Sequence, residues 1–140
     1  MFRFLSPRIL LVCSIAVLSI AAMLLLVDTV PPRSLTHAHM HMMKRRILRY
    51  AGTHDALPTS IEQLPRIDGF ANEVTDGWGR AILWQIKDGE FTLISYGRDG
   101  MAGGDGEDAD MIAVFRVKTE DGVWADEFCE WQIDPFGRGK

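Results

Sequence analysis

The stretch AILWQIKDGEFTLIS, residues 81–95, decides the fold because two alternating apolar runs flank an Asp-Gly pair. The residues that share one face are Ile82, Trp84 and Ile86 in the first run and Phe91, Leu93 and Ser95 in the second. Asp-Gly between such runs is a strong hairpin signal, with the turn at Lys87–Glu90. A third run at residues 111–117 is rich in Val, Ile and Phe, so we expect a small antiparallel sheet.

The segment before this sheet predicts a helix that packs on it. Pro31 and Pro32 interrupt any preceding helix, Ser34 or Thr36 can cap a new one that runs to about residue 51, and Gly52 is a natural stop. An apolar stripe at helical spacing comprises Met40, Met43, Ile47 and Tyr50.

A second, short helix is expected from Thr59 to about Leu64, because Thr59 and Glu62 have the spacing of a capping box. Residues 66–75 show no clear period and are expected to run over the surface. In the C-terminal segment, Asp121-Gly122 suggests a turn. The aromatic residues Trp124, Phe128, Trp131 and Phe136 suggest that the segment folds back on the body.

The N-terminal segment predicts a membrane anchor. From Ile9 to Val27 no residue is charged, and a helix of that length spans a hydrocarbon core of about 30 Å. Arg3 and Arg8 precede the run and Asp28 follows it, so the positive-inside tendency leaves the N-terminus cytoplasmic and the rest extracytoplasmic. A cleavable secretory signal with a site near residues 19–21 is the alternative, although cleavage there leaves an apolar new terminus.

Charge and cysteine content exclude other classes. A formal charge of −4 argues against nucleic acid as a partner, and no small-molecule substrate is indicated. Cys13 lies in the apolar run and Cys129 near the C-terminus, so no intramolecular disulfide is expected. His37 and His41 are spaced to share a metal ion, with His39 elsewhere, but no carboxylate or cysteine nearby completes a shell. A metal-dependent hydrolase is therefore disfavoured, and we expect no enzyme activity.

The segment most suggestive of chemistry is residues 97–110, which we call the acidic loop. It holds five carboxylates and five glycines and no lysine. So many like charges favour either an open solvated loop or a bound hard cation, of which Ca²⁺ suits the chemistry best because it accepts oxygens in tolerant geometry. The acid pattern is not that of an EF-hand.

Three segments resemble, in order and spacing, the C-terminal half of the major pseudopilin of type II secretion, the protein G family. They are Asp76-Gly77-Trp78-Gly79-Arg80, the hairpin, and the stretch from Ser95 through Gly97-Arg98-Asp99-Gly100 and Gly103-Gly104-Asp105-Gly106-Glu107-Asp108-Ala109-Asp110 to Ile112. The family's equivalents read approximately Asp-Pro-Trp-Gly-Asn-Pro, Ser-Leu-Gly-Ala-Asp-Gly and Gly-Gly-x-Gly-x-Asp-Ala-Asp-Ile. The resemblance covers residues 57–112 well and the preceding helix loosely.

The resemblance implies a pilin-like α+β fold and a loop that binds Ca²⁺. Carried over by position, Asp99 and Asp110 are the first ligand candidates. The other candidates are Asp108, Asp105, Glu107 and the carbonyl of Tyr96. Trp78 is then expected to be a core anchor below the sheet.

The N-terminal segment departs from the family. No glycine precedes the apolar run and no Glu lies within it, so the motif for leader cleavage and filament register is absent and we expect a permanent tether. The expected organisation is a cytoplasmic N-terminus at 1–8, a transmembrane anchor at 9–27, a linker at 28–35, a pseudopilin-like domain at 36–117 and a C-terminal extension at 118–140.

The expected function is a non-enzymatic, calcium-stabilised, pseudopilin-like structural protein associated with type II secretion or a related envelope machine. It is expected to be anchored in the inner membrane, with its domain periplasmic or otherwise extracytoplasmic. Its expected partners are the membrane, other secretion-system subunits or further copies of itself. The alternative is an independent envelope binding module that reuses the domain and recognises a partner through the aromatic C-terminal segment and the acidic loop.

Overall fold

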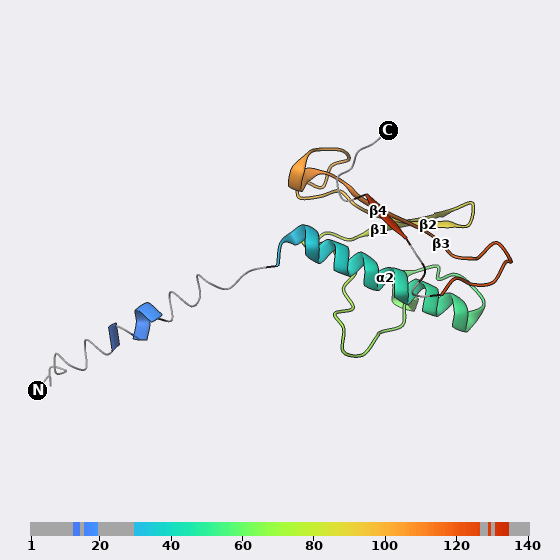
Figure 1. Ribbon diagram of the computed structural model, residues 1–140, viewed down its shortest axis with the longest axis horizontal. Coiled ribbons are helices and arrows are strands. Elements are labelled where there is room, and N and C mark those ends of the chain that lie inside the picture. Colours follow the sequence, from blue (N-terminus) through green and yellow to red (C-terminus); the bar gives the residue numbers. More distant parts are fainter. Residues whose placement is uncertain (1–12, 15, 20–29, 127–128, 130, 135–140) are drawn as a thin grey trace, which may run out of the picture. The chain divides into compact units, whose positions relative to one another are not determined.

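The computed structural model describes residues 13–14, 16–19, 30–126, 129 and 131–134. The chain divides into two compact units, Met1–Val30 and Pro31–Lys140. The elements of the second unit, in chain order, are α2 (Pro32–His54), the 3-10 helix η1 (Ile61–Gln63), β1 (Leu83–Lys87), β2 (Glu90–Ser95), the 3-10 helix η2 (Gly106–Asp108), β3 (Met111–Arg116) and β4 (Gln132–Asp134) (Figure 1).

The expected transmembrane anchor at residues 9–27 falls mostly outside the described residues. Within it, residues 13–14 and 16–19 are helical. In the portions of the chain that can be described, no helix has both the length and the apolar character needed to cross a membrane. The anchor therefore stays a prediction.

The sheet is a four-stranded antiparallel meander in the order β1-β2-β3-β4. The β1–β2 turn has positive φ angles at Asp88 (53°) and Gly89 (80°), which is the type I′ geometry that matches strand twist. Phe91 pairs with Phe115 across β2 and β3, and their rings stack at 5.4 Å. The predicted hairpin and third strand are confirmed, whereas β4 is a strand that the sequence did not predict.

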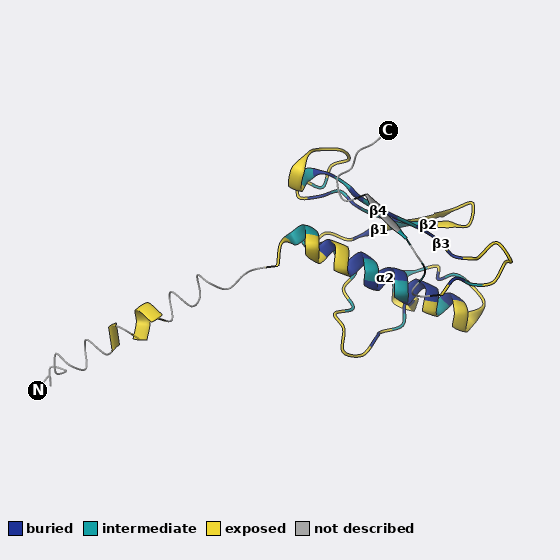
Figure 2. Cartoon of the chain, viewed as in Figure 1, coloured by how far each residue is buried: buried dark blue, intermediate teal, exposed yellow. Residues whose placement is uncertain are grey.

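Helix α2 lies across one face of this sheet and forms the core with it (Figure 2). Met40, Met43 and Ile47 are fully buried in one core cluster with Phe91 and Leu93 of β2. The apolar stripe of α2 differs from expectation at its C-terminal end. Tyr50 is only half-buried and stacks on His54, and the buried residues there are Leu48 and Ala51. Among the strand residues expected to face inward, Ile86 is instead 42% exposed.

The bounds of α2 also differ from expectation. The helix begins at Pro32, which suits its first turn because the proline's missing N–H needs no partner there. It continues through Gly52 and ends at His54. The next residue, Asp55, is the C-cap and adopts a left-handed conformation (φ 51°). Residues 32–35, expected to be part of a linker, are thus helical.

The expected capping box is wrong. The second helix is a single 3-10 turn that starts at Ile61, with Ser60 as its N-cap and no side-chain cap. Gln63, not Glu62, reaches back, and its Oε1 accepts a hydrogen bond from the Thr59 amide at 2.7 Å. Glu62 is exposed, and a hydrogen bond with Ser60 lowers its pKa.

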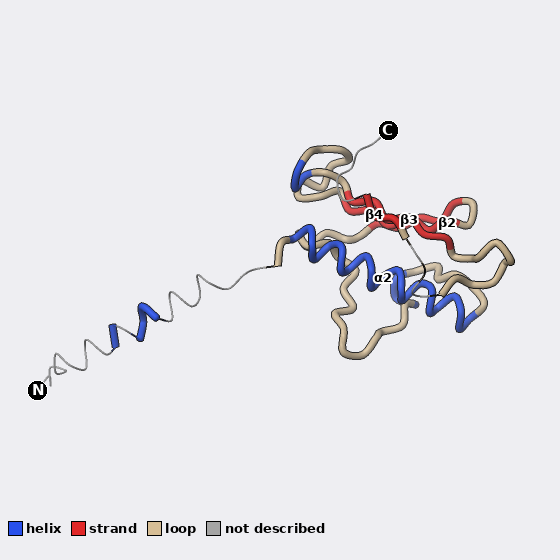
Figure 3. Tube along the Cα trace, viewed as in Figure 1, coloured by secondary structure: helices blue, strands red, loops and turns tan. Residues whose placement is uncertain are grey.

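The segment between η1 and β1 runs over the surface as a long loop (Figure 3). Arg46 of α2 ties it to the body by donating hydrogen bonds to the carbonyls of Leu64 (3.1 Å), Pro65 (2.8 Å) and Asn72 (2.9 Å). The expected surface excursion at residues 66–75 is confirmed, and within it Ile67 is buried (6% exposed).

The C-terminal segment returns to the body, as expected. Trp124, Cys129 and Trp131 pack against the core, and the expected contributions of Phe128 and Phe136 fall outside the described residues. Lys44 of α2 is 1% exposed and donates a hydrogen bond to the Cys129 carbonyl at 2.5 Å. The ammonium group also lies 5.4 Å from the centroid of the Trp131 ring.

Candidate cation-binding loop

The acidic loop connects β2 to β3 and is closed at its base by backbone contacts. The Arg98 amide donates to the Glu107 carbonyl at 2.8 Å. Gly97 has φ +61°, and a Cβ added there would lie 2.6 Å from the Asp108 carbonyl oxygen. Gly104 is similarly constrained, at φ +81° and 2.7 Å from the same oxygen. Glycine is therefore required where the two limbs of the loop meet.

Asp99 and Asp110, the first ligand candidates, both bind the same turn of the loop. Asp99 Oδ1 accepts a hydrogen bond from the Met101 amide and Asp110 Oδ2 from the Gly103 amide, each at 3.0 Å. The second oxygen of Asp110, Oδ1, is buried and has no hydrogen-bond partner among the described residues. The Tyr96 carbonyl accepts the Gly100 amide at 3.1 Å.

Asp108 and Glu107 are instead engaged by Arg98. The guanidinium contacts Asp108 in a bidentate fork, with Nε–Oδ1 at 2.9 Å and Nη2–Oδ2 at 3.0 Å. Its Nη1 lies 3.3 Å from Glu107 Oε2. The Asp108 carboxylate raises the pKa of Arg98, first through this hydrogen bond and then through its charge. Arg98 is therefore the counter-ion of both Asp108 and Glu107.

The fifth acid, Asp105, is exposed and precedes η2, where its carbonyl accepts the Asp108 amide at 3.1 Å. Within the described ranges, no three or more His, Cys, Asp or Glu side chains form a group that could hold a metal ion. The loop thus brings Asp99 and Asp110 to one turn but directs Asp108 and Glu107 to Arg98. The ligand prediction is neither confirmed nor contradicted by this arrangement.

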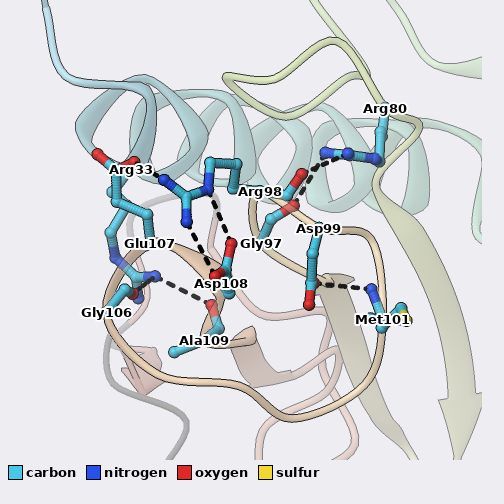
Figure 4. A network of polar contacts seen from close by, with 10 residues as sticks. All are labelled: Arg33, Arg80, Gly97, Arg98, Asp99, Met101, Gly106, Glu107, Asp108 and Ala109. Atoms are coloured by element: carbon cyan, nitrogen blue, oxygen red, sulfur yellow. Dashed lines mark hydrogen bonds and ion pairs between the residues drawn. The ribbon is translucent and has the colours of Figure 1, made fainter.

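Two further arginines, which the sequence interpretation missed, also bind the acidic loop (Figure 4). Arg33 at the start of α2 donates to the carbonyls of Gly106 (2.7 Å) and Ala109 (2.9 Å). Arg80 donates to the carbonyl of Gly97 at 3.0 Å and to that of Arg98. The sequence signal for Arg80 was its place in the Trp-Gly motif, but nothing local marked Arg33.

The Trp-Gly motif is anchored by its aspartate and not by its tryptophan. Asp76 is 3% exposed; Oδ1 accepts the amides of Trp78 (3.0 Å) and Arg80 (2.9 Å), and Oδ2 accepts the Ser95 hydroxyl at 2.8 Å. Trp78 is only half-buried and is absent from the core cluster, so its expected role as a core anchor is wrong. Asp76 fixes the turn that presents Arg80 to the acidic loop.

The histidines of α2 have separate roles. The rings of His37 and His41 lie near the Trp131 ring, with centroids 5.9 and 5.3 Å from its centroid. Burial, and next the charges of Lys44 and Arg45, lower the pKa of His41. His39 is 7% exposed, and its Nδ1 lies 2.6 Å from the Thr75 carbonyl. His37 and His41 are packing neighbours of an aromatic ring.

Comparison with known protein families gives a match over most of the domain. The model of a protein family described as type II secretion system (T2SS), protein G matches residues 34–114, which is more than half of the 140 residues. The matched range runs from the first turn of α2 into β3 and includes the whole acidic loop. No curated protein and no solved structure matches the chain significantly.

Proposed function

The chain belongs to the protein G family of type II secretion systems, and we propose on this basis that it is a non-enzymatic, pseudopilin-like structural protein. The family has a structural role in secretion. The observation that carries the proposal is the match over residues 34–114, which lies within one packed unit of a long helix on an antiparallel sheet. A structural role of the pilin type requires no catalytic residue.

We further propose that the acidic loop binds Ca²⁺ and is stabilised by it. The residues suit the ion, which takes about six to eight oxygen ligands in tolerant geometry. Asp110 Oδ1 is a buried carboxylate oxygen with no hydrogen-bond partner among the described residues, and leaving such an oxygen without a partner costs free energy that a bound cation would offset. Asp99, Asp110 and the Tyr96 carbonyl are the first-choice ligands, whereas Asp108 and Glu107 already contact Arg98. Asp105 is exposed and accessible to a cation.

The test is thermal unfolding of the full chain in mild detergent, with millimolar Ca²⁺ or with a chelator. A ligand at about 100 times its dissociation constant stabilises the native state by about 2.7 kcal/mol, so the melting temperature should rise with Ca²⁺. The double variant Asp99→Ala/Asp110→Ala should lose the shift. Asp68→Ala/Glu73→Ala makes the same charge change at exposed positions outside the acidic loop and should retain the shift. An unchanged melting temperature in the wild-type chain would refute calcium binding.

The proposed location is the inner membrane, with one span at residues 9–27 and the domain in the periplasm. The support is the uncharged run together with arginines before it and Asp28 after it. Protease added to spheroplasts should remove a C-terminal tag, and alkaline extraction should leave the chain in the membrane. A tag protected from protease until lysis would reverse the orientation.

The proposed partners are other subunits of the secretion machine or further copies of this chain. Proximity labelling in the native membrane should mark such subunits. If the labelled neighbours include none of them and no second copy of the chain, the alternative of an independent envelope binding module replaces the secretion role.

A further inference from the structure

Three guanidinium groups from three parts of the chain converge on the acidic loop (Figure 4). Arg33 comes from the first turn of α2, Arg80 from the turn before β1, and Arg98 from the loop itself. Together they contact four loop carbonyls, those of Gly97, Arg98, Gly106 and Ala109, and the carboxylates of Glu107 and Asp108. Carbonyl and carboxylate oxygens are also the donors that a hard cation takes.

Arg98 neutralises charge with its side chain and also bonds to the backbone through its amide. Its amide donates to the Glu107 carbonyl at 2.8 Å while its side chain forks onto the Asp108 carboxylate, so Arg98 joins its own limb of the loop to the limb at residues 107–108 twice. The planar guanidinium matches a carboxylate in two parallel hydrogen bonds, which a point charge such as a lysine does not.

We propose that Arg98 is a built-in counter-ion of the acidic loop, which holds the loop folded without a metal ion and lowers its affinity for Ca²⁺. The second part rests on the proposed calcium binding. A cation that uses Asp108 or Glu107 must displace the guanidinium, and a cation held by Asp99 and Asp110 is repelled by its charge. The acidic loop is therefore already folded when Ca²⁺ arrives, with Arg33 and Arg80 holding its carbonyls.

The side chain of Arg98 is 57% exposed, and a single exposed ion pair adds little to global stability. We therefore expect the contribution of Arg98 to appear in the rate at which the acidic loop opens locally, and not in the global free energy of unfolding. In a chelator, Arg98→Gln should exchange the amides of residues 97–110 about two- to fivefold faster than the wild-type chain, the fold-change that corresponds to an exposed ion pair. Peptides from β2 should be unaffected. The measurement is hydrogen exchange by mass spectrometry on the full chain.

The matched control is Arg116→Gln. Arg116 is 70% exposed and pairs with Glu90 at 3.5 Å at the opposite end of β3, so it makes the same charge change outside the acidic loop. In calcium titrations, Arg98→Gln should bind about three- to tenfold more tightly than the wild-type chain, because one positive charge near the site is removed. Arg116→Gln should match the wild type in both experiments.

The outcomes separate the two proposals. If Arg98→Gln leaves exchange in the chelator unchanged, Arg98 does not hold the loop, whatever the calcium result. If neither chain binds Ca²⁺, the calcium proposal and the competition fail, while faster exchange still supports the metal-free role of Arg98. If Ca²⁺ binds both chains equally, the competition is refuted and the calcium proposal stands.

Discussion

Replacing Asp76 by alanine tests the junction between the Trp-Gly turn and the sheet. The 3% exposed carboxylate accepts two turn amides and the hydroxyl of Ser95, which is itself 1% exposed. Hydrogen bonds to a charged group contribute about 1.5–3 kcal/mol each, and a buried donor left unpaired costs about 1–3 kcal/mol. Because the turn amides can reach water after the change, we expect Asp76→Ala to lower the free energy of unfolding by about 3–5 kcal/mol.

Urea unfolding of the full chain in mild detergent, followed by circular dichroism, measures this loss. Asp76→Asn keeps one acceptor oxygen and lets the Ser95 hydroxyl turn to accept, so it should cost about 1–2 kcal/mol. Ser95→Ala leaves Oδ2 buried without its partner and should cost about 1–3 kcal/mol. If Asp76→Ala stays within about 1 kcal/mol of the wild type, or if Asp76→Asn costs as much as Asp76→Ala, the account of this junction is wrong.

Two further predictions concern the glycines and the histidines. Gly97→Ala should lower the free energy of unfolding by about 1–3 kcal/mol more than Gly103→Ala in thermal melts, because both residues have positive φ but only Gly97 meets backbone atoms. Equal losses would show that the limbs of the acidic loop do not touch at Gly97. Stability should fall as pH drops below 6.5, because burial and then Lys44, Arg45 and His37 lower the pKa of His41, so the unfolded chain binds protons that the folded chain does not. Urea unfolding at about pH 7.5 and about pH 5.5 should show a smaller difference in His41→Gln than in the wild type, and an identical difference would refute the assignment.

The parts of the fold that the sequence predicted are those with local signals. Asp88-Gly89 supplies the positive φ angles of a type I′ turn, so the hairpin follows from two residues and their alternating flanks. Strand β4 has no such signal, because three residues, Gln-Ile-Asp, show no period and owe their conformation to pairing with β3. The capping box failed because the turn starts at Ile61, which moves the N-cap to Ser60, and Gln63 accepts the Thr59 amide that Glu62 was expected to accept.

The candidate site divides in the same way. The acidic loop was visible because its acids are adjacent in the sequence, and the turn that collects Asp99 and Asp110 lies within it. The contacts from Arg33 span 73 and 76 positions to carbonyl groups, which every residue carries and no residue type reveals. The ion pair between Arg98 and Asp108 depends on the side-chain conformation of Arg98, which sequence spacing alone does not predict.

The contact between Lys44 and Cys129 joins residues 85 positions apart, and β4 pairs with β3 later still in the chain. The β1–β2–β3 meander can assemble as soon as it leaves the ribosome, but α2 cannot bury Lys44 until Cys129 has been synthesised. Loop closure over such a separation is slow relative to hairpin formation. The domain thus remains incompletely packed until its C-terminal segment, including Cys129, has been synthesised.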